Sequence, residues 1–176
     1  PRLHRRLLPD DVPTEAVFMD GNQFHALWLG LVQKMSLCGR QLRRALSQLT
    51  EPRGLTDHDA LILWSCQQAG PLGHAQHEMA AALGISPAQL SGLVETLSDR
   101  GWISGRRPSH DRRRQYWRIT TSGEAILAAL VQDLELWSLQ FESSLPPEQR
   151  DALDQTLLAL TAATARLNSP AQREAA

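Results

Sequence analysis

Residues 76–101, QHEMAAALGISPAQLSGLVETLSDRG, decide the fold of this chain. The first eight of them predict a short helix, and Gly84 follows where a helix end favours a left-handed residue. Ser86 then predicts the N-cap of a second helix, with Pro87 at the first helical position, where a missing N–H costs nothing. The apolar positions of this second helix recur with helical spacing at Leu90, Leu93, Val94 and Leu97. Two helices joined by a glycine turn predict a helix-turn-helix.

The residues that follow predict two β-strands. Residues 102–106 and 115–119 are short and rich in residues that favour strands, and a polar stretch separates them. Two such strands around a polar loop indicate a β-hairpin. A hairpin placed directly after the second helix of a helix-turn-helix is a wing.

Helices are predicted on both sides of this unit. A long apolar stripe runs through residues 22–49, and Thr56 with Asp59 forms a near capping box that starts a helix over residues 57–69. We expect that helix to bury Leu61, Ile62 and Trp64. Two more helices are predicted over residues 120–144 and 147–167, with a break at Pro146 and Pro147.

The predicted fold class is mostly α with a small β-hairpin wing, a winged helix-turn-helix joined to further helices. The expected division is a winged helix-turn-helix domain over residues 55–119, helical segments over residues 22–54 and 120–167, an N-terminal extension over residues 1–21 and a tail over residues 168–176.

The composition is that of a globular protein. Hydrophobic residues make up 42% of the 176 residues and charged residues 21%, which excludes an intrinsically disordered chain. Net charge is −1, but residues 100–118 contain seven arginines and one acid, and residues 124–154 contain seven acids and one arginine. This separation of charge favours a polyanion as partner of the basic segment, and a solvated charged surface is the alternative.

Other function classes find little support in the sequence. We find no glycine-rich phosphate loop, nucleophile elbow or zinc-protease motif, so neither an enzyme nor a bound cofactor is expected. No apolar run approaches the ~18 residues that span a bilayer, and no secretion signal is evident, so we expect a cytoplasmic location and no membrane partner. The two cysteines, Cys38 and Cys66, are interpreted as small buried apolar residues.

The chain resembles the MarR (multiple antibiotic resistance regulator) family of transcription regulators. The resemblance is carried by residues 72–101 and 106–123, above all by Asp111-Arg112-Arg113 followed by Thr120-Thr121-Ser122-Gly123, and it extends over about residues 22–167. It implies an obligate homodimer in which the first, fifth and sixth helices of both chains intertwine. By this resemblance, residues 22–54 and 120–167 form the helical dimerisation region, and residues 55–119 form the winged helix-turn-helix DNA-binding domain. The leucine-rich terminal helices independently need a covering surface that a winged domain of ~75 residues does not provide.

The resemblance also implies that double-stranded DNA is the partner. The first turns of the second helix would enter the major groove, where Gln89 can pair with adenine and Ala88 can contact a thymine methyl. Ser91 and Gly92 lie on the same face, and Ser86 with the helix N-terminus can hold a phosphate. Gly92 departs from the family, whose members often carry a long polar or basic side chain there.

The wing supplies the second set of predicted DNA contacts. Arg113 is the candidate for insertion into a narrow minor groove, and Arg112 or Arg114 can contact a phosphate. Asp111 is expected to support the loop by pairing with an arginine. A dimer would bind a pseudo-palindromic operator.

Members of the family typically sense a small molecule or an oxidant. A small-molecule effector that relieves repression would bind between the dimer helices and the winged domain, where His25, Trp28, His58 and Trp64 are the candidates. Core packing is the competing interpretation of both tryptophans. An oxidant sensor would use Cys38 or Cys66, but Cys38 lies late in its helix and the one tyrosine, Tyr116, lies in the wing.

Two further hypotheses stay open at this point. His74, His77 and Glu78 form a weak zinc motif at a helix start, and we expect no metal site there. A winged helix can also serve as a protein-interaction module without binding DNA. The arginines around the wing argue against that alternative.

Overall fold

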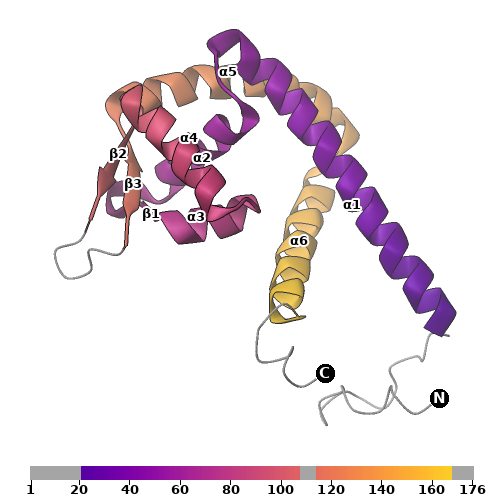
Figure 1. Cartoon of the computed structure of the whole chain (residues 1–176). Coiled ribbons are helices and arrows are strands. Elements are labelled where there is room, and N and C mark those ends of the chain that lie inside the picture. The colour runs from indigo at the N-terminus through magenta and orange to yellow at the C-terminus, as the bar shows by residue number, and fades with distance from the viewer. Residues whose placement is uncertain (1–20, 108–113, 168–176) are drawn as a thin grey trace. The chain divides into compact units, whose positions relative to one another are not determined.

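The computed structural model describes residues 21–107 and 114–167. Most of this part of the chain is helical, and three short strands form its one sheet (Figure 1). The elements follow in the order α1 (Gly21–Thr50), η2 (Glu51–Arg53), α2 (Asp57–Gln68), η3 (Gly70–Leu72), β1 (His74–Ala75), α3 (Gln76–Leu83), α4 (Pro87–Asp99), β2 (Ile103–Arg106), β3 (Tyr116–Ile119), α5 (Thr121–Ser144) and α6 (Pro147–Leu167).

The chain divides into two compact units between Leu46 and Ser47. The described part of the first unit is most of α1. The second unit contains everything from the last turn of α1 onward, including the helix-turn-helix, the sheet, α5 and α6. The predicted division at residues 54 and 55 remains a functional hypothesis, because compactness alone does not define a dimerisation region.

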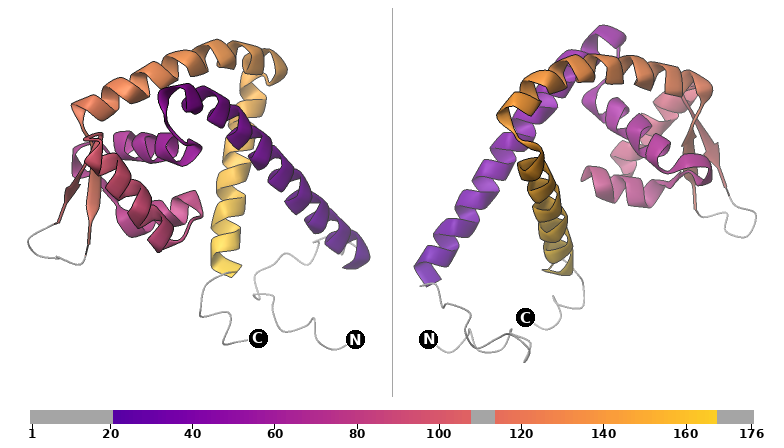
Figure 2. Two further views of the ribbon diagram at one scale, coloured as in Figure 1. Left: turned by 45° about the horizontal axis from the view of Figure 1, so that its top comes forward. Right: turned by 180° about the vertical axis from the view of Figure 1, so that it is seen from behind.

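The core of the second unit is formed where α2, α3, α4, the sheet and α5 pack together (Figure 2). Its large, fully buried apolar side chains come from all of these helices and from β2. Each contributes about 1.5–3 kcal/mol of burial free energy relative to an exposed position. They are Ile62 and Leu63 from α2, Met79 from α3, Leu90, Val94 and Leu97 from α4, Ile103 from β2 and Leu130 from α5.

The sheet has the strand order β1-β3-β2, and both pairings are antiparallel. The predicted hairpin is confirmed: β2 and β3 pair with Ile103 opposite Ile119 and Arg106 opposite Tyr116. The third strand, β1, was not expected from the sequence. It consists of only two residues, and a strand this short carries no alternation that a sequence pattern could reveal.

The N-terminus of α2 confirms the predicted cap. The Thr56 side chain accepts a hydrogen bond from the Asp59 main-chain N–H at 3.1 Å, and Asp59 Oδ2 accepts one from the Thr56 N–H at 2.9 Å. The prediction of the buried face was partly wrong, because Ile62 is buried but Leu61 is only half-buried and Trp64 is 49% exposed. Helical geometry places Asp59, Ile62, Leu63 and Cys66 on one side, and this side faces the core.

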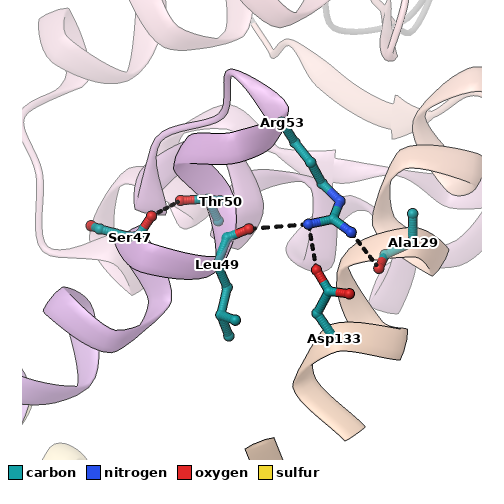
Figure 3. A network of polar contacts seen from close by, with 6 residues as sticks. All are labelled: Ser47, Leu49, Thr50, Arg53, Ala129 and Asp133. Carbon is teal, nitrogen blue, oxygen red and sulfur yellow. Dashed lines mark hydrogen bonds and ion pairs between the residues drawn. The ribbon is translucent and has the colours of Figure 1, made fainter. Parts of the chain in front are cut away.

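The last turn of α1 is tied to α5 by a polar network around Arg53 (Figure 3). The Arg53 guanidinium forms an ion pair with Asp133 and donates hydrogen bonds to the Leu49 carbonyl at 3.2 Å and the Ala129 carbonyl at 3.3 Å. Thr50 is fully buried, and its hydroxyl donates to the Ser47 carbonyl at 3.2 Å. A planar guanidinium with a fixed fork of donors is suited to joining two segments in this way.

The terminal helices expose much of their apolar surface. Residues 136, 139 and 158 are leucines on α5 and α6 that are 72%, 65% and 63% exposed, and Leu153 and Leu157 on α6 are also exposed. In the first unit, Leu27, Leu29 and Leu37 of α1 are exposed as well. Within one chain these helices therefore lack the cover that their composition requires.

We expect Thr56→Ala to lower the free energy of unfolding by about 1 kcal/mol, because it leaves the Asp59 N–H at the start of α2 without its acceptor. Urea unfolding at one fixed protein concentration measures the change. Thr121→Ala is the control, since Thr121 is exposed in the first turn of α5. Equal losses in the two variants would show that the capping box does not stabilise α2.

Candidate nucleic-acid interface

The turn between α3 and α4 has the geometry that the sequence predicts. Gly84 adopts a left-handed conformation with φ of 65°, where a residue with a side chain is strained. The Ile85 N–H then donates to the Ala80 carbonyl at 3.1 Å and closes the end of α3. Ser86 caps α4 by accepting a hydrogen bond from the Gln89 N–H at 3.2 Å.

The first turns of α4 have one buried and one exposed face. Leu90, Val94 and Leu97 are buried against the core. The remaining side contains four of the predicted DNA-contacting residues in exposed positions, and the first turn contains no acidic side chain. The four are Ser86, Ala88, Gln89 and Gly92.

Ser91 differs from these four because its hydroxyl is already engaged within the protein. Its side chain is half-buried, accepts a hydrogen bond from Gln76 Nε2 at 2.9 Å and donates one to the Pro87 carbonyl at 3.0 Å. Gln76 also accepts a hydrogen bond from Trp117 Nε1 at 3.0 Å. Sequence analysis did not identify Gln76 as a functional residue, since its partners are distant in sequence.

The hairpin carries several arginines, and its strand β2 packs against α4. Arg106 and Arg118 are exposed on the paired strands, and Arg114 is exposed just before β3. Arg107 Nε donates to Gln115 Oε1 at 2.7 Å across the base of the loop. The loop residues Asp111, Arg112 and Arg113 lie outside the described residues, so their predicted roles stay predictions.

Arg100, the first arginine of the basic segment, has a structural role. Its guanidinium donates to the Gly54 carbonyl at 2.9 Å and lies 4.9 Å from the ring centroid of Trp102. It thereby connects the end of α4 with the turn before α2. The charge count of the sequence therefore overstates the number of arginines available to a polyanion.

The predicted effector residues are divided between the two units. His25 and Trp28 belong to the first unit, and His58 and Trp64 lie on α2 in the second. The core-packing interpretation of the tryptophans was wrong for the single chain, since Trp28 is 39% and Trp64 49% exposed. The Nδ1 atom of His58 lies 3.2 Å from Oδ1 of Asp57.

The second unit contains an open depression of about 360 Å³ that sequence analysis did not identify. It is lined by Leu49, Asp133, Leu136 and Trp137, and so by none of the four predicted effector residues. Three of the lining residues are apolar. The fourth, Asp133, is the ion-pair partner of Arg53. The helical spacing of residues 133, 136 and 137 was visible in the sequence, but their proximity to Leu49 depends on tertiary packing.

The two cysteines have different environments. Cys38 is exposed on α1, which contradicts the expectation that it is buried, because nothing within the described part of the chain covers that face. Cys66 is fully buried as expected, and burial raises the pKa of its thiol to about 12. The thiolate is the reactive form, so Cys66 is protonated and unreactive at neutral pH, which argues against it as a redox site.

The weak zinc motif does not form a ligand cluster. Among the described residues, no three His, Cys, Asp or Glu side chains converge on a position that could hold a metal ion. His74 lies in β1 with its Nδ1 buried, whereas His77 and Glu78 are exposed on α3.

No helix in the described part of the chain combines the length and apolar character that crossing a bilayer requires.

Residues 53–114, from the end of η2 through the hairpin loop, match the sequence model of the MarR family. The winged helix-turn-helix of this chain is therefore similar to the MarR family over these residues. The repressor MprA from Escherichia coli K12 is 30% identical over 78 residues, which are 44% of this chain and 44% of MprA. The chain therefore matches less than half the length of this MarR-type relative.

Solved structures share the fold over a larger part of the chain. The Staphylococcus aureus MepR–DNA complex has a TM-score of 0.61 at 19% identity, covering 75% of this chain and 96% of MepR. CouR from Rhodococcus jostii RHA1, bound to p-coumaroyl-CoA, has a TM-score of 0.63 at 22% identity, covering 72% of this chain and 87% of CouR. The MarR family consists of transcription regulators, which agrees with the prediction that this chain is not an enzyme.

We expect the thiol of Cys66 to react with a neutral thiol reagent at pH 8 only after the protein unfolds, because burial holds its pKa at about 12. A Cys38→Ser variant leaves Cys66 as the only thiol, and labelling is followed with and without urea. Labelling of the folded variant at the rate of the unfolded one would contradict the burial of Cys66.

Proposed function

We propose that this protein is a transcription regulator that binds a pseudo-palindromic operator in double-stranded DNA as a homodimer. The observation that carries the proposal is the exposed, acid-free N-terminal face of α4, which the Gln76 side chain links to the arginine-bearing hairpin. A helix end of this kind fits the major groove, and a basic hairpin fits the backbone or the minor groove beside it. The shared fold with MepR, which has been solved in complex with DNA, supports the same assignment.

Individual roles follow from the chemistry of the exposed side chains. Gln89 can donate and accept a bidentate pair with adenine, and Ala88 can contact a thymine methyl. Ser86 and the main-chain N–H groups at the start of α4 can bind a phosphate. A Cβ at Gly92 would meet no atom of the described residues within 4 Å, so the backbone there is open to close approach of the DNA.

The wing arginines are assigned to the phosphate backbone and the minor groove. Arg113 is proposed to enter the minor groove, with Arg112 and Arg114 at phosphates and Asp111 supporting the loop. Ser91 is assigned a positioning role in place of a base contact, because its hydroxyl already has two protein partners. A DNA partner accords with the expected cytoplasmic location.

Binding to DNA is tested by selecting duplexes from a random library and measuring their affinity over a range of salt concentrations. We expect the selected duplex to bind more tightly than random DNA, with log K falling by several units per log unit of salt. Gln89→Ala should lower discrimination between the duplexes by about 1–3 kcal/mol, and Arg113→Ala should reduce the salt slope by about one.

Arg166→Ala serves as the matched control, since Arg166 is exposed near the end of α6. It should leave both affinities unchanged. Weak binding to selected and random DNA alike, with little salt dependence, would contradict the DNA-binding proposal and favour a protein-interaction module.

The homodimer is proposed on the exposed leucines of the terminal helices. Large apolar side chains on α1, α5 and α6 remain exposed within one chain, and a second copy of the same helices would bury them. By the family resemblance, α1, α5 and α6 are also the helices that would intertwine in the dimer.

We expect Leu139→Glu/Leu158→Glu to shift the protein from dimer toward monomer, because a buried carboxylate without a partner is costly in an interface. Sedimentation velocity over a concentration series measures the shift. Leu72→Glu is the control, as Leu72 is 73% exposed in η3 of the winged domain. Identical dimer fractions in both variants and the parent would contradict this interface.

A small-molecule effector that releases the repressor from its operator is the proposed form of regulation. CouR, which shares the fold, was solved with p-coumaroyl-CoA bound. In this chain the depression next to Asp133 offers apolar and charged contacts, and His25, Trp28, His58 and Trp64 remain predicted contacts. Oxidant sensing is the less favoured alternative, since the buried thiol of Cys66 is held protonated.

A further inference from the structure

One side chain, that of Gln76, links three elements of the winged domain. Gln76 is the first residue of α3, and its main-chain N–H donates to the Gln115 carbonyl at 2.8 Å just before β3. Its side-chain Oε1 accepts from Trp117 on β3 at 3.0 Å, and its Nε2 donates to Ser91 on α4 at 2.9 Å. Both polar atoms of the side-chain amide are therefore hydrogen-bonded, the oxygen to the wing and the nitrogen to the recognition helix.

The hydrogen bonds form a directed series from the sheet to the first turn of α4. Trp117 donates to Gln76, Gln76 donates to Ser91, and Ser91 donates to the Pro87 carbonyl at 3.0 Å. Hydrogen bonds in such a series polarise one another. Trp117 is only 8% exposed, and its indole N–H would lose its acceptor if the Gln76 amide were removed.

Apolar packing and hydrogen bonds act on α4 in different ways. Leu90, Val94 and Leu97 hold the helix on the core through the hydrophobic effect, which has no preferred direction. Hydrogen bonds, in contrast, are directional. Ser91 lies one turn after Pro87 and Ala88, in the part of the helix that is proposed to meet the bases. A small rotation of α4 would displace Gln89 from a base edge without changing the charge of the interface.

We infer that Gln76 is a positioning residue that fixes the recognition helix against the wing, so that discrimination between DNA sequences depends on the Trp117–Gln76–Ser91 series. The inference rests on the proposed DNA-binding function. Nonspecific binding depends mainly on charge and tolerates a rotated helix, whereas base contacts require accurate geometry. Loss of Gln76 should therefore weaken sequence-specific binding selectively.

The test uses Gln76→Met, which keeps the length of the side chain and removes both of its hydrogen bonds. Affinities for the selected duplex and for random DNA are measured across a salt series, beside Ser91→Ala and the double variant. We expect Gln76→Met to lower affinity for the selected duplex about tenfold, with random binding and the salt slope unchanged. The double variant should lose no more than Gln76→Met, because both substitutions break one series.

Gln67→Met on the exposed side of α2 is the matched control and should leave discrimination unchanged. Unfolding midpoints identify any loss that comes from folding. Equal losses on both duplexes, unchanged discrimination or additive losses in the double variant would each overturn the positioning role. A parent protein that shows no discrimination would instead refute the proposed function, and with it this inference.

Discussion

The arrangement of the winged domain depends on the packing and hydrogen bonding of the buried Trp117 side chain. It lies on β3, the central strand, whose backbone pairs with β1 on one side and β2 on the other. Gly105 of β2 allows the ring to lie close, because a Cβ there would lie only 3.0 Å from Trp117 Cζ3. The polar end of the ring needs a partner, and Gln76 provides it. Apolar packing and one hydrogen bond together fix the sheet against α3 and α4.

A second polar network, around Arg53, joins the end of α1 to α5 in the second unit. Arg53 connects the Leu49 carbonyl in the last turn of α1 with Asp133 and the Ala129 carbonyl on α5 (Figure 3). Asp133 and Leu49 also line the open depression. A molecule that bound there would therefore contact the same residues that hold α5 to the end of α1. Binding of the proposed effector could in this way alter the contact between these two helices.

The distribution of polar and apolar surface separates two kinds of interface. The exposed face of α4 and the wing offers amide, hydroxyl and guanidinium groups, which suit a hydrated polyanion. The exposed leucines of α1, α5 and α6 suit a second apolar helical surface. Arg100 and Arg107 show that charge counting alone misjudges the first interface, because both guanidinium groups have partners inside the protein.

The sequence was sufficient to predict the features that depend on residues within about four positions of one another. Ser86 and Pro87 start α4, Gly84 ends α3, and Thr56 with Asp59 caps α2, because caps and turns are formed by neighbouring main-chain groups. The helical periods of α1, α5 and α6 were visible for the same reason. The basic wing could be located from composition and from the hairpin pattern.

Tertiary packing was needed to decide which faces are covered and which distant groups meet. The outward position of Trp64 and the exposure of Cys38 depend on what packs against each helix, and a helical period does not contain that information. The strand β1 exists because β3 offers a free edge to two residues. Gln76 meets Trp117 across 41 residues of sequence, and such contacts arise only when the folded chain brings separate hydrogen-bonding groups into range.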